Sequence, residues 1–373
     1  MQSQAIIKAT KLIKKNSSKL NLSRKNVKDL DCDALFPLLA SNVSTISKLD
    51  LHDNQISELG ASTLVQALLP PKYLKKPSYE LAVGEVDLQI VSNLNYLDLS
   101  YNKLGSSGAE VVADLVRYTN ISTLNLTHNN IRSRGLSAIS QALTWGSGLK
   151  QLFLNSNGIC QFGIKSISQT LLNNPCLQEL HLSYNNIRNE GIRMISEALT
   201  RNNQLKTIAL KSNYLDDQGM MYITKMLAVN DTITHMDLSL NAITDDGATI
   251  LLTSFESNET LLSLNVNENA ISLKIQSQLD QMLFRNFELL KNSKELFKIS
   301  RFLILLNQIP TDIKSIVLQQ FFYSWDSKSA RAVFSILLDR LSIGAIVDQT
   351  VTFNSKNLAN QCVKLRYQNS ILY

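Results

Sequence analysis

The sequence repeats itself at an interval of 28 residues. Six consecutive segments begin at Ile121, Leu149, Leu177, Leu205, Ile233 and Leu261, and three more divergent ones begin at Ser17, Ile46 and Leu94. Each reads LxxLxLxxN, then a turn, a glycine and an apolar helical pattern, as in "LQELHLSYNNIRNEGIRMISEAL" (177–199). Because one such unit cannot bury its own apolar side, the units must stack on one another.

Each unit predicts a short strand followed by a helix. In the unit that begins at Leu177, Leu180 and Leu182 alternate with Glu179 and His181, which indicates a strand with one buried face. Apolar residues then recur every three or four positions, which indicates a helix. A helix is about 10 Å wide and paired strands lie about 4.8 Å apart, so stacking bends the array into a horseshoe with a parallel sheet inside.

Two polar or small residues mark the turn of nearly every unit. The asparagines are Asn54, Asn102, Asn129, Asn157, Asn185, Asn213, Asn241 and Asn269, and the glycines are Gly60, Gly108, Gly135, Gly163, Gly191, Gly219 and Gly247. A buried amide can bond backbone groups that a turn leaves unpaired. Glycine permits close packing of helix on strand or an unusual φ. Both ladders are therefore interpreted as structural.

This repeat resembles the leucine-rich repeats of the ribonuclease-inhibitor-like class, to which the Ran GTPase-activating proteins and the sensor regions of NOD-like receptors belong. The resemblance covers about 270 of the 373 residues. It implies an α/β solenoid, a horseshoe with the parallel sheet inside and the helices outside.

Three domains are expected along the chain. Residues 1–16 predict an N-terminal capping helix, 17–286 hold nine repeats, and 287–373 predict an all-α C-terminal domain. The second repeat carries an insertion at 70–93, "PPKYLKKPSYELAVGEVDLQIVSN", with three of the six prolines. An insertion of this kind is either a solvated loop or a contact with a partner.

The C-terminal segments 287–306, 311–325 and 329–344 have the apolar spacing of amphipathic helices. They are expected to cover the exposed apolar end of the ninth repeat. The stretch "IPTDIKSIVLQQF" (309–321) is similar to the opening of an F-box, a helical module that docks substrate receptors onto a ubiquitin ligase, although Ile309 replaces the usual leucine. This resemblance implies an alternative function as a ubiquitin-ligase adaptor.

Charge and cysteine usage limit the class of protein. The net charge of +6 comes from the ends, because 17–286 carry 22 basic and 25 acidic residues, so no basic stripe indicates nucleic-acid binding. The four cysteines, Cys32, Cys160, Cys176 and Cys362, form no CxxC pair and suggest free thiols in a reducing compartment. The longest apolar run, "FLILL" (302–306), is too short to span a membrane. We expect a cytoplasmic monomer.

Catalysis and metal binding have little support in the sequence. All four histidines, His52, His128, His181 and His235, fall at outward strand positions. They lie in alternate units, about 10 Å apart, whereas zinc needs its nitrogen ligands about 2.0–2.1 Å from one ion. No phosphate-binding loop, nucleophile elbow or HExxH motif occurs. We expect no enzyme activity, no metal and no cofactor.

The inner face of the sheet is the candidate partner-binding surface. Its expected contact residues are Tyr96, Tyr101, His128, Phe153, His181, Tyr184 and His235. Aromatic residues often dominate binding energy at protein interfaces, and an outward-facing Phe153 has no core role to explain it. We expect Phe153, His181, Tyr184 and His128 to form the centre of the site.

The main hypothesis is therefore a non-enzymatic protein–protein interaction module. Frequent Asn, Ser, Lys and Ile, with repeats followed by a helical end, resemble the leucine-rich-repeat effectors that intracellular bacteria deliver into host cytosol. A Ran-type GTPase-activating protein is a further alternative. That family typically adds an acidic tail, whereas this chain ends with the basic "CVKLRYQNSILY" (362–373). No catalytic residue can be assigned from that resemblance.

Overall fold

The computed structural model describes the chain except for residues 1–3, 16, 43, 70–92, 145–146 and 307–373, and it places side chains as far as residue 291. Contacts divide the chain into two units, 1–283 and 284–373. All strands of the described residues lie in the first unit. No described helix is long and apolar enough to cross a membrane.

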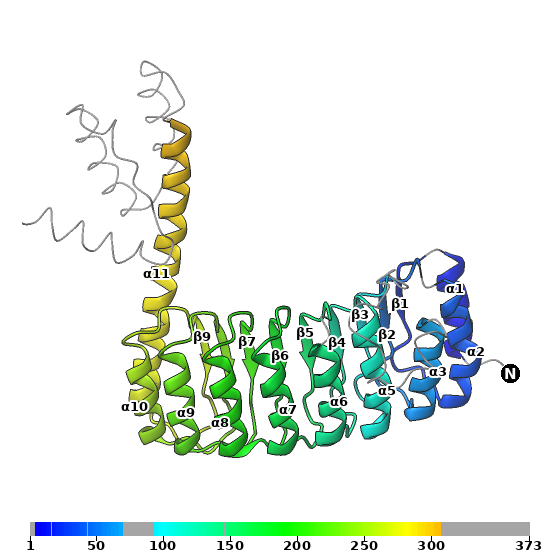
Figure 1. The fold of residues 1–373 in the computed structure, drawn as a ribbon, viewed down its shortest axis with the longest axis horizontal. Coiled ribbons are helices and arrows are strands. Elements are labelled where there is room, and N and C mark those ends of the chain that lie inside the picture. The colour runs from blue at the N-terminus through cyan, green and yellow to red at the C-terminus, as the bar shows by residue number, and fades with distance from the viewer. Residues whose placement is uncertain (1–3, 16, 43, 70–92, 145–146, 307–373) are drawn as a thin grey trace, which may run out of the picture. The chain divides into compact units, whose positions relative to one another are not determined.

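Nine three-residue strands form one parallel sheet in chain order (Figure 1). They are β1 (Lys19–Asn21), β2 (Lys48–Asp50), β3 (Tyr96–Asp98), β4 (Thr123–Asn125), β5 (Gln151–Phe153), β6 (Glu179–His181), β7 (Thr207–Ala209), β8 (His235–Asp237) and β9 (Ser263–Asn265). Equivalent positions of neighbouring repeats pair directly, for example Leu152 with Leu180. The parallel sheet expected from the repeat is confirmed.

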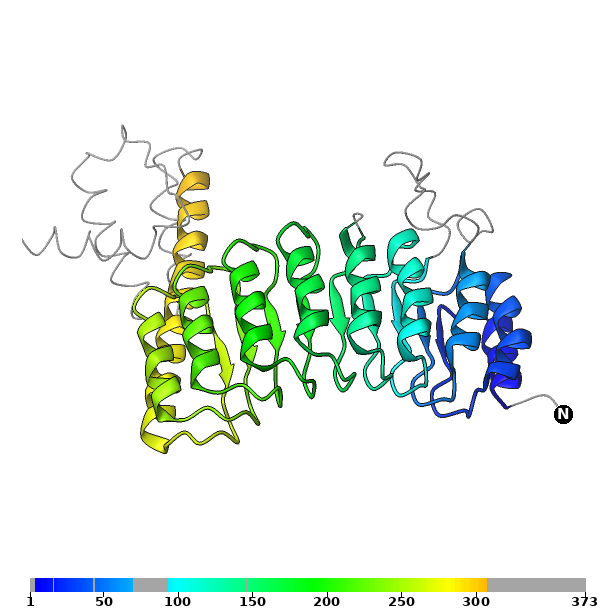
Figure 2. The same ribbon diagram turned by 60° about the horizontal axis from the view of Figure 1, so that its bottom comes forward.

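A helix follows each strand, and from α2 to α10 each helix packs on the helix of the neighbouring repeat. The helices are α1 (Gln4–Lys14), α2 (Asp29–Ala40), α3 (Glu58–Leu68), α5 (Gly105–Tyr118), α6 (Arg132–Thr144), α7 (Gln161–Leu171), α8 (Arg188–Leu199), α9 (Asp217–Leu227), α10 (Asp245–Ser254) and α11 (Leu273–Leu306). From α2 to α10 they cover one face of the sheet, and within the described residues these helices leave the other face open (Figures 1 and 2). This arrangement is the solenoid that the repeat predicts.

The core is a single apolar layer between the sheet and the helices. In the sixth repeat the side chains of Leu177, Leu180, Leu182, Ile195 and Leu199 are all buried. Buried residues of this kind continue without a break from Ala5 to Leu279. Because burying one such side chain contributes about 1.5–3 kcal/mol, stability depends on neighbours on both sides of each repeat.

The turn asparagines form a continuous hydrogen-bond ladder. Asn185 Nδ2 donates to the carbonyl oxygens of Leu154 and Leu182 at 3.0 and 2.8 Å. Its Oδ1 accepts from the backbone N–H groups of Asn157 and Ile159 at 3.0 and 2.9 Å. Each amide thus links one turn to the turn before it, so the structural role predicted for these residues is confirmed.

A second asparagine ladder, missed in the sequence, runs through the loops that precede the strands. Its members are the buried residues Asn174, Asn202, Asn230 and Asn258. Asn202 Nδ2 donates to the Leu171 carbonyl at 2.7 Å, and its Oδ1 accepts from Leu205 N at 2.8 Å. The side chain therefore bonds the backbone of its own loop and also binds the C-terminal end of α7, the helix of the preceding repeat.

The recurring glycines permit close packing between successive helices, which differs from the expected packing of helix on strand. A Cβ on Gly163 would lie 2.8 Å from Ser133 Cα in α6, and one on Gly135 would lie 2.8 Å from Ala109 Cβ in α5. None of these recurring glycines has a positive φ, so the alternative of an unusual backbone is wrong. The missing side chain is what lets consecutive helices approach.

The two ends of the repeat array differ from its middle. At the N-terminus, α1 buries Ala5 and Ala9 and packs Leu12 against the core. The capping role of residues 1–16 stays a prediction. At the other end the helix expected over 287–306 is part of a longer helix, α11, that begins at Leu273. Its first turns thus supply the helix of the ninth repeat.

Several expectations fall on other parts of the chain. Residues 70–92 of the predicted insertion lie outside the described residues. So do the expected helices at 311–325 and 329–344 and the F-box-like stretch at 309–321. The predicted domain boundaries and the all-α domain over 287–373 stay predictions.

Candidate protein-binding surface

The open face of the sheet carries the outward side chains of every strand and of the three residues that follow it. We call this surface the sheet face. Strand pairing sets its rows, because Phe153 of β5 lies directly beside His181 of β6 and Asn125 of β4. The seven candidate residues all lie on the sheet face, but they form separate groups on it.

Three rings at the ends of consecutive strands form the first group. The rings of His52 and Tyr101 meet edge to face with centroids 5.2 Å apart. Tyr101 then stacks on His128, with centroids 4.9 Å apart and an interplanar angle of 18°. His52 Nδ1 lies 2.9 Å from Ser100 Oγ, which orients the first ring. The result is a row of rings across the second, third and fourth repeats.

The second group is the pair Phe153 and His181. Their rings stack with centroids 4.4 Å apart and an interplanar angle of 17°. His181 Nε2 is buried without a hydrogen bond, and the nearest carboxylate oxygen, Glu179 Oε2, lies 3.6 Å away. Burial lowers the pKa of His181 below its ordinary value, and the nearby carboxylate of Glu179 offsets this only in part. A neutral imidazole therefore lies against the phenyl ring.

Tyr184 and Tyr96 each lie beside a lysine and apart from the two ring groups. Lys211 Nζ is 5.7 Å from the Tyr184 ring centroid, and the Tyr184 hydroxyl holds the pKa of Lys211 above its usual value. Lys48 Nζ is 5.5 Å from the Tyr96 ring centroid. Tyr96 donates to Asp98 Oδ2 at 3.2 Å, and burial together with that carboxylate raises the pKa of Tyr96 to about 12.

His235 is the candidate with the least support from neighbours. Its side chain is exposed, and its Nδ1 lies 2.8 Å from Thr234 Oγ1.

The four residues that were expected to form the centre of the site do not form one cluster. The structure brings Phe153 and His181 together but places Tyr184 with Lys211, and His128 with Tyr101.

Several polar side chains of the sheet face are held by bonds within the protein. Asn21 Nδ2 donates to Asp50 Oδ2 at 2.7 Å, and Asn125 Nδ2 donates to Asp98 Oδ2 at 3.0 Å. Asp98 Oδ1 also accepts from the backbone N–H of Ser100 at 2.8 Å. These carboxylates stabilise the strand ends, whereas the exposed rings of Tyr101 and Tyr184 are available to a partner.

Three candidate residues occupy backbone positions that are unfavourable for their type. The residue before each turn asparagine is left-handed, with φ between 52° and 58° at Asp53, Tyr101, His128, Ser156, Tyr184, Ser212, Leu240 and Glu268. Small residues such as glycine and asparagine adopt this conformation at least cost. The repeat needs the left-handed turn, but it does not need a tyrosine there.

Three residues of these groups were missed in the sequence as binding candidates, namely His52, Lys48 and Lys211. The repeat spacing could have indicated two of them. Lys48 is paired with Tyr96 in the strand register, and His52 lies in the repeat before the one that holds Tyr101. Among the described residues no three His, Cys, Asp or Glu side chains are grouped to hold a metal ion.

A family model described as "Leucine Rich repeat" matches residues 92–113, 119–140, 173–196 and 229–251. Each match includes one of the strands described above. The chain is a leucine-rich-repeat protein. The full helix in every 28-residue repeat is typical of the ribonuclease-inhibitor-like class of these proteins.

Two solved structures are similar to this leucine-rich-repeat protein. One, titled as actin-binding site 2 of leiomodin-1, is 16% identical, has a TM-score of 0.39, and covers 43% of this chain and 94% of its own. The tropomodulin C-terminal domain of Caenorhabditis elegans is 17% identical, has a TM-score of 0.39, and covers 43% of this chain and 97% of its own. No curated protein sequence matches the chain.

Proposed function

We propose that this chain is a non-enzymatic module that binds a partner protein on the sheet face. The observation that carries the proposal is the exposure of two tyrosine rings on that face. Tyr101 is 48% exposed and Tyr184 is 49% exposed, and both have left-handed backbones. Neither ring is buried in the core, and tyrosine is not favoured at a left-handed turn.

The energetics favour contact with a protein surface. A partly exposed aromatic ring offers a large apolar area with few rotatable bonds, so little side-chain entropy is lost on binding. Tyr101 is already stacked on His128, and Phe153 is stacked on His181, so these rings are oriented before a partner arrives. Pre-organised rings of this kind are typical of the few residues that dominate an interface.

The partner we propose is a eukaryotic protein met in host cytosol. The support is the resemblance of the composition and repeat architecture to effectors delivered by intracellular bacteria. The adaptor alternative depends on 309–321, which lie outside the described residues. No described side chain favours GTPase activation.

The experiment is affinity capture from eukaryotic cytosol with the full-length chain, followed by mass spectrometry. Wild type is compared with Phe153→Ala and Tyr184→Ala, and with Met221→Ala as a matched control. Met221 is also an exposed apolar residue, at 46%, but it lies on helix α9. We expect one protein that wild type and the control retain and that both sheet-face variants lose.

Circular dichroism and thermal unfolding must show that the variants keep their fold. If both folded sheet-face variants retain the same proteins as wild type, the proposed surface is wrong. The same capture from a bacterial lysate tests whether the partner is a host protein. If a bacterial homologue of the partner is captured equally well, the proposal of a host protein loses its support.

A further inference from the structure

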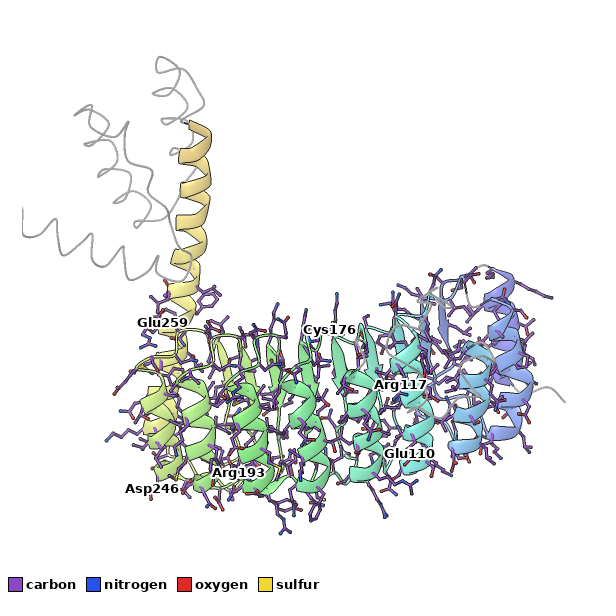
Figure 3. All side chains as sticks on the ribbon, viewed as in Figure 1. Glu110, Arg117, Cys176, Arg193, Asp246 and Glu259 are labelled. Carbon is purple, nitrogen blue, oxygen red and sulfur yellow. The ribbon has the colours of Figure 1, made fainter. Side chains whose placement is uncertain are left out.

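A second surface lies at the edge of the repeats where strands end and helices begin. Figure 3 marks that edge by Asp246, near the start of α10, and the opposite edge by Cys176, which precedes β6. At the first edge a hollow of about 480 Å³ is lined by Cys160, Gln161, Asn186, Arg188 and Tyr214. We call it the turn-edge hollow. It spans the fifth, sixth and seventh repeats and includes none of the rings of the sheet face.

Two arginines flank the thiol of this hollow in neighbouring repeats. The third residue after the turn asparagine is Arg132, Cys160 and Arg188 in three successive repeats. Arg132 Nε donates to Asn130 Oδ1 at 3.2 Å. Within the described part of the chain neither arginine has a carboxylate within 4.0 Å.

Other arginines at this side of the repeats are neutralised. Arg24 lies 3.3 Å from Asp53, Arg134 pairs with Glu110, and Arg193 lies 2.6 Å from both Glu190 and Glu197. In contrast, the guanidinium groups of Arg132 and Arg188 form no ion pair within the described part of the chain. The N-terminus of α7, which begins at Gln161, adds a partial positive charge of the same sign.

Two large aromatic side chains accompany these charges. Tyr214 lines the hollow and is 67% exposed, and Phe162, the residue after Gln161, is 75% exposed. At the position of Tyr214 the other repeats have Asn26, Gln55, Lys103, Asn130, Gly158, Asn186, Ala242 and Ala270. Tyr214 is left-handed, with φ of 60°, so glycine or asparagine would cost less there. Packing within the repeat does not explain a tyrosine.

From these observations we propose that the turn-edge hollow binds an acidic linear segment of a partner protein. A carboxylate of the segment accepts hydrogen bonds from the Arg188 guanidinium, whose planar fork fits a carboxylate in bidentate geometry. An apolar side chain next to that carboxylate packs on the exposed ring of Tyr214. Charge complementarity selects an acidic segment, and the small volume selects a few residues of extended chain. This surface does not depend on binding at the sheet face.

Cys160 supplies a direct report of occupancy, since its thiol lines the hollow. The full-length chain is mixed with an array of acetylated pentapeptides that combine Asp or Glu with Leu, Phe or Tyr. A matched array carries Asn or Gln in place of each acid. Fluorescence polarisation measures affinity, and the alkylation rate of Cys160, followed by mass spectrometry of its peptide, measures protection of the hollow.

We expect members of the acidic array to bind, to slow alkylation of Cys160, and to bind more weakly as salt is raised. Arg188→Gln should weaken this binding by at least about fivefold, in keeping with a charge-assisted contact at a partly exposed site. Arg201→Gln is the matched control, because Arg201 is exposed and precedes the strand at the opposite edge. Phe153→Ala should leave peptide binding unchanged.

Three results would overturn the proposal. The first is no binding by any acidic peptide at millimolar concentration. The second is equal binding by the Asn and Gln array, which would show that charge is not recognised. The third is equal loss of affinity in Arg188→Gln and Arg201→Gln, which would show a general charge effect without a site.

Discussion

The imidazole of His181 stacks on the phenyl ring of Phe153, and its Nε2 is buried without a hydrogen bond. The stack joins two neighbouring repeats through side chains on the open side of the sheet. A protonated ring would need solvent or a full hydrogen bond to Glu179, whose Oε2 is 3.6 Å away. The arrangement therefore favours the neutral form, with consequences for stability at low pH.

Stability should fall as the pH drops, in part because of His181. Burial lowers its pKa in the folded protein below the usual 6.5, while Glu179 and Asp237 oppose the shift. Below that usual value the unfolded chain takes up a proton more readily than the folded chain, so acid favours unfolding. The contribution of His181 is present above pH 6.5 and is lost as the pH falls toward its folded pKa.

Urea unfolding of wild type and His181→Gln at pH 7.5 and pH 5.0 measures this effect. Titration of other groups lowers the free energy of unfolding of both proteins between pH 7.5 and pH 5.0. The effect of His181 is therefore the difference between the loss in wild type and the loss in His181→Gln. We expect the smaller loss in His181→Gln. Equal losses would show that the buried imidazole does not discriminate between its two protonation states.

Tyr184→Asn should separate stability from binding. Asparagine tolerates the left-handed backbone, and the relief of strain is about 1 kcal/mol. Loss of the contact between the ring and Lys211 costs less than this, because Lys211 is partly exposed to solvent. The two effects oppose each other, so the melting temperature should stay within a few degrees of wild type.

Partner binding by Tyr184→Asn should weaken by about tenfold or more if the ring is a main contact of the interface. The measurement is affinity for the captured partner by calorimetry, with Ser212→Asn as control. Ser212 occupies the equivalent left-handed turn of the next repeat. Wild-type affinity of Tyr184→Asn for the partner would contradict the assignment of the ring to binding.

The cysteines should differ in their reaction with iodoacetamide at pH 7.5. Burial and the carboxylates of Asp29, Asp31 and Asp33 raise the pKa of Cys32 to about 12, so this thiol should react only after unfolding. Cys160 should react quickly in the native chain. Peptide mass spectrometry after timed labelling distinguishes the two sites.

The reactivity of Cys160 has a cause that can be tested. Partial burial opposes ionisation, but the hydroxyl of Ser133, 3.2 Å from Cys160 Sγ, and the N–H groups of Phe162 and Gly163 outweigh it and lower the pKa. Ser133→Ala should therefore slow the labelling of Cys160 and leave that of Cys32 unchanged. Labelling at the wild-type rate would mean that the helix N-terminus alone sets the reactivity.

The strand pairing was predictable because the repeat has a constant length. A spacing of 28 residues places Phe153 and His181 at the same strand position, and a parallel sheet then makes them neighbours. The inward direction of Leu180 and the outward direction of His181 follow from alternation along a strand. Neither result depends on side-chain rotamers.

Contacts among the rings could not be read from spacing. Tyr101 reaches both His52 and His128 because its backbone is left-handed, and the sequence pattern does not reveal that conformation. The ladder from Asn174 to Asn258 was missed for another reason. It keeps the 28-residue period but lies three residues before each LxxLxLxxN segment. The loop there has no apolar pattern that would indicate a buried side chain.

Gly163→Ala should destabilise the chain by about 1–3 kcal/mol. The new Cβ would lie 2.8 Å from the backbone Cα of Ser133, so α6 and α7 must move apart. Gly148→Ala is the control, because no atom lies within 4 Å of its Cβ position. Chemical unfolding should show the control within about 0.5 kcal/mol of wild type. Equal effects would mean that the helices have room to adjust.

The second asparagine ladder includes one of two adjacent asparagines, Asn173 and Asn174, which differ in burial. Asn174 is buried, and its Nδ2 donates to the Leu143 carbonyl at 3.0 Å while its Oδ1 accepts from Cys176 N and Leu177 N at 2.9 and 2.8 Å. Asn173 is exposed. Asn174→Ala leaves three backbone groups without these bonds, so it should cost about 2–4 kcal/mol.

Asn173→Ala should change the free energy of unfolding by less than about 0.5 kcal/mol, as is usual for an exposed polar residue. Urea unfolding of the two variants measures the contrast. Hydrogen exchange adds a local measurement, because the Leu177 amide should exchange faster in Asn174→Ala alone. Since each repeat is stabilised through its neighbours, that opening should extend into the adjoining repeats. Similar stability and exchange in both variants would show that the loops hold their conformation without the ladder.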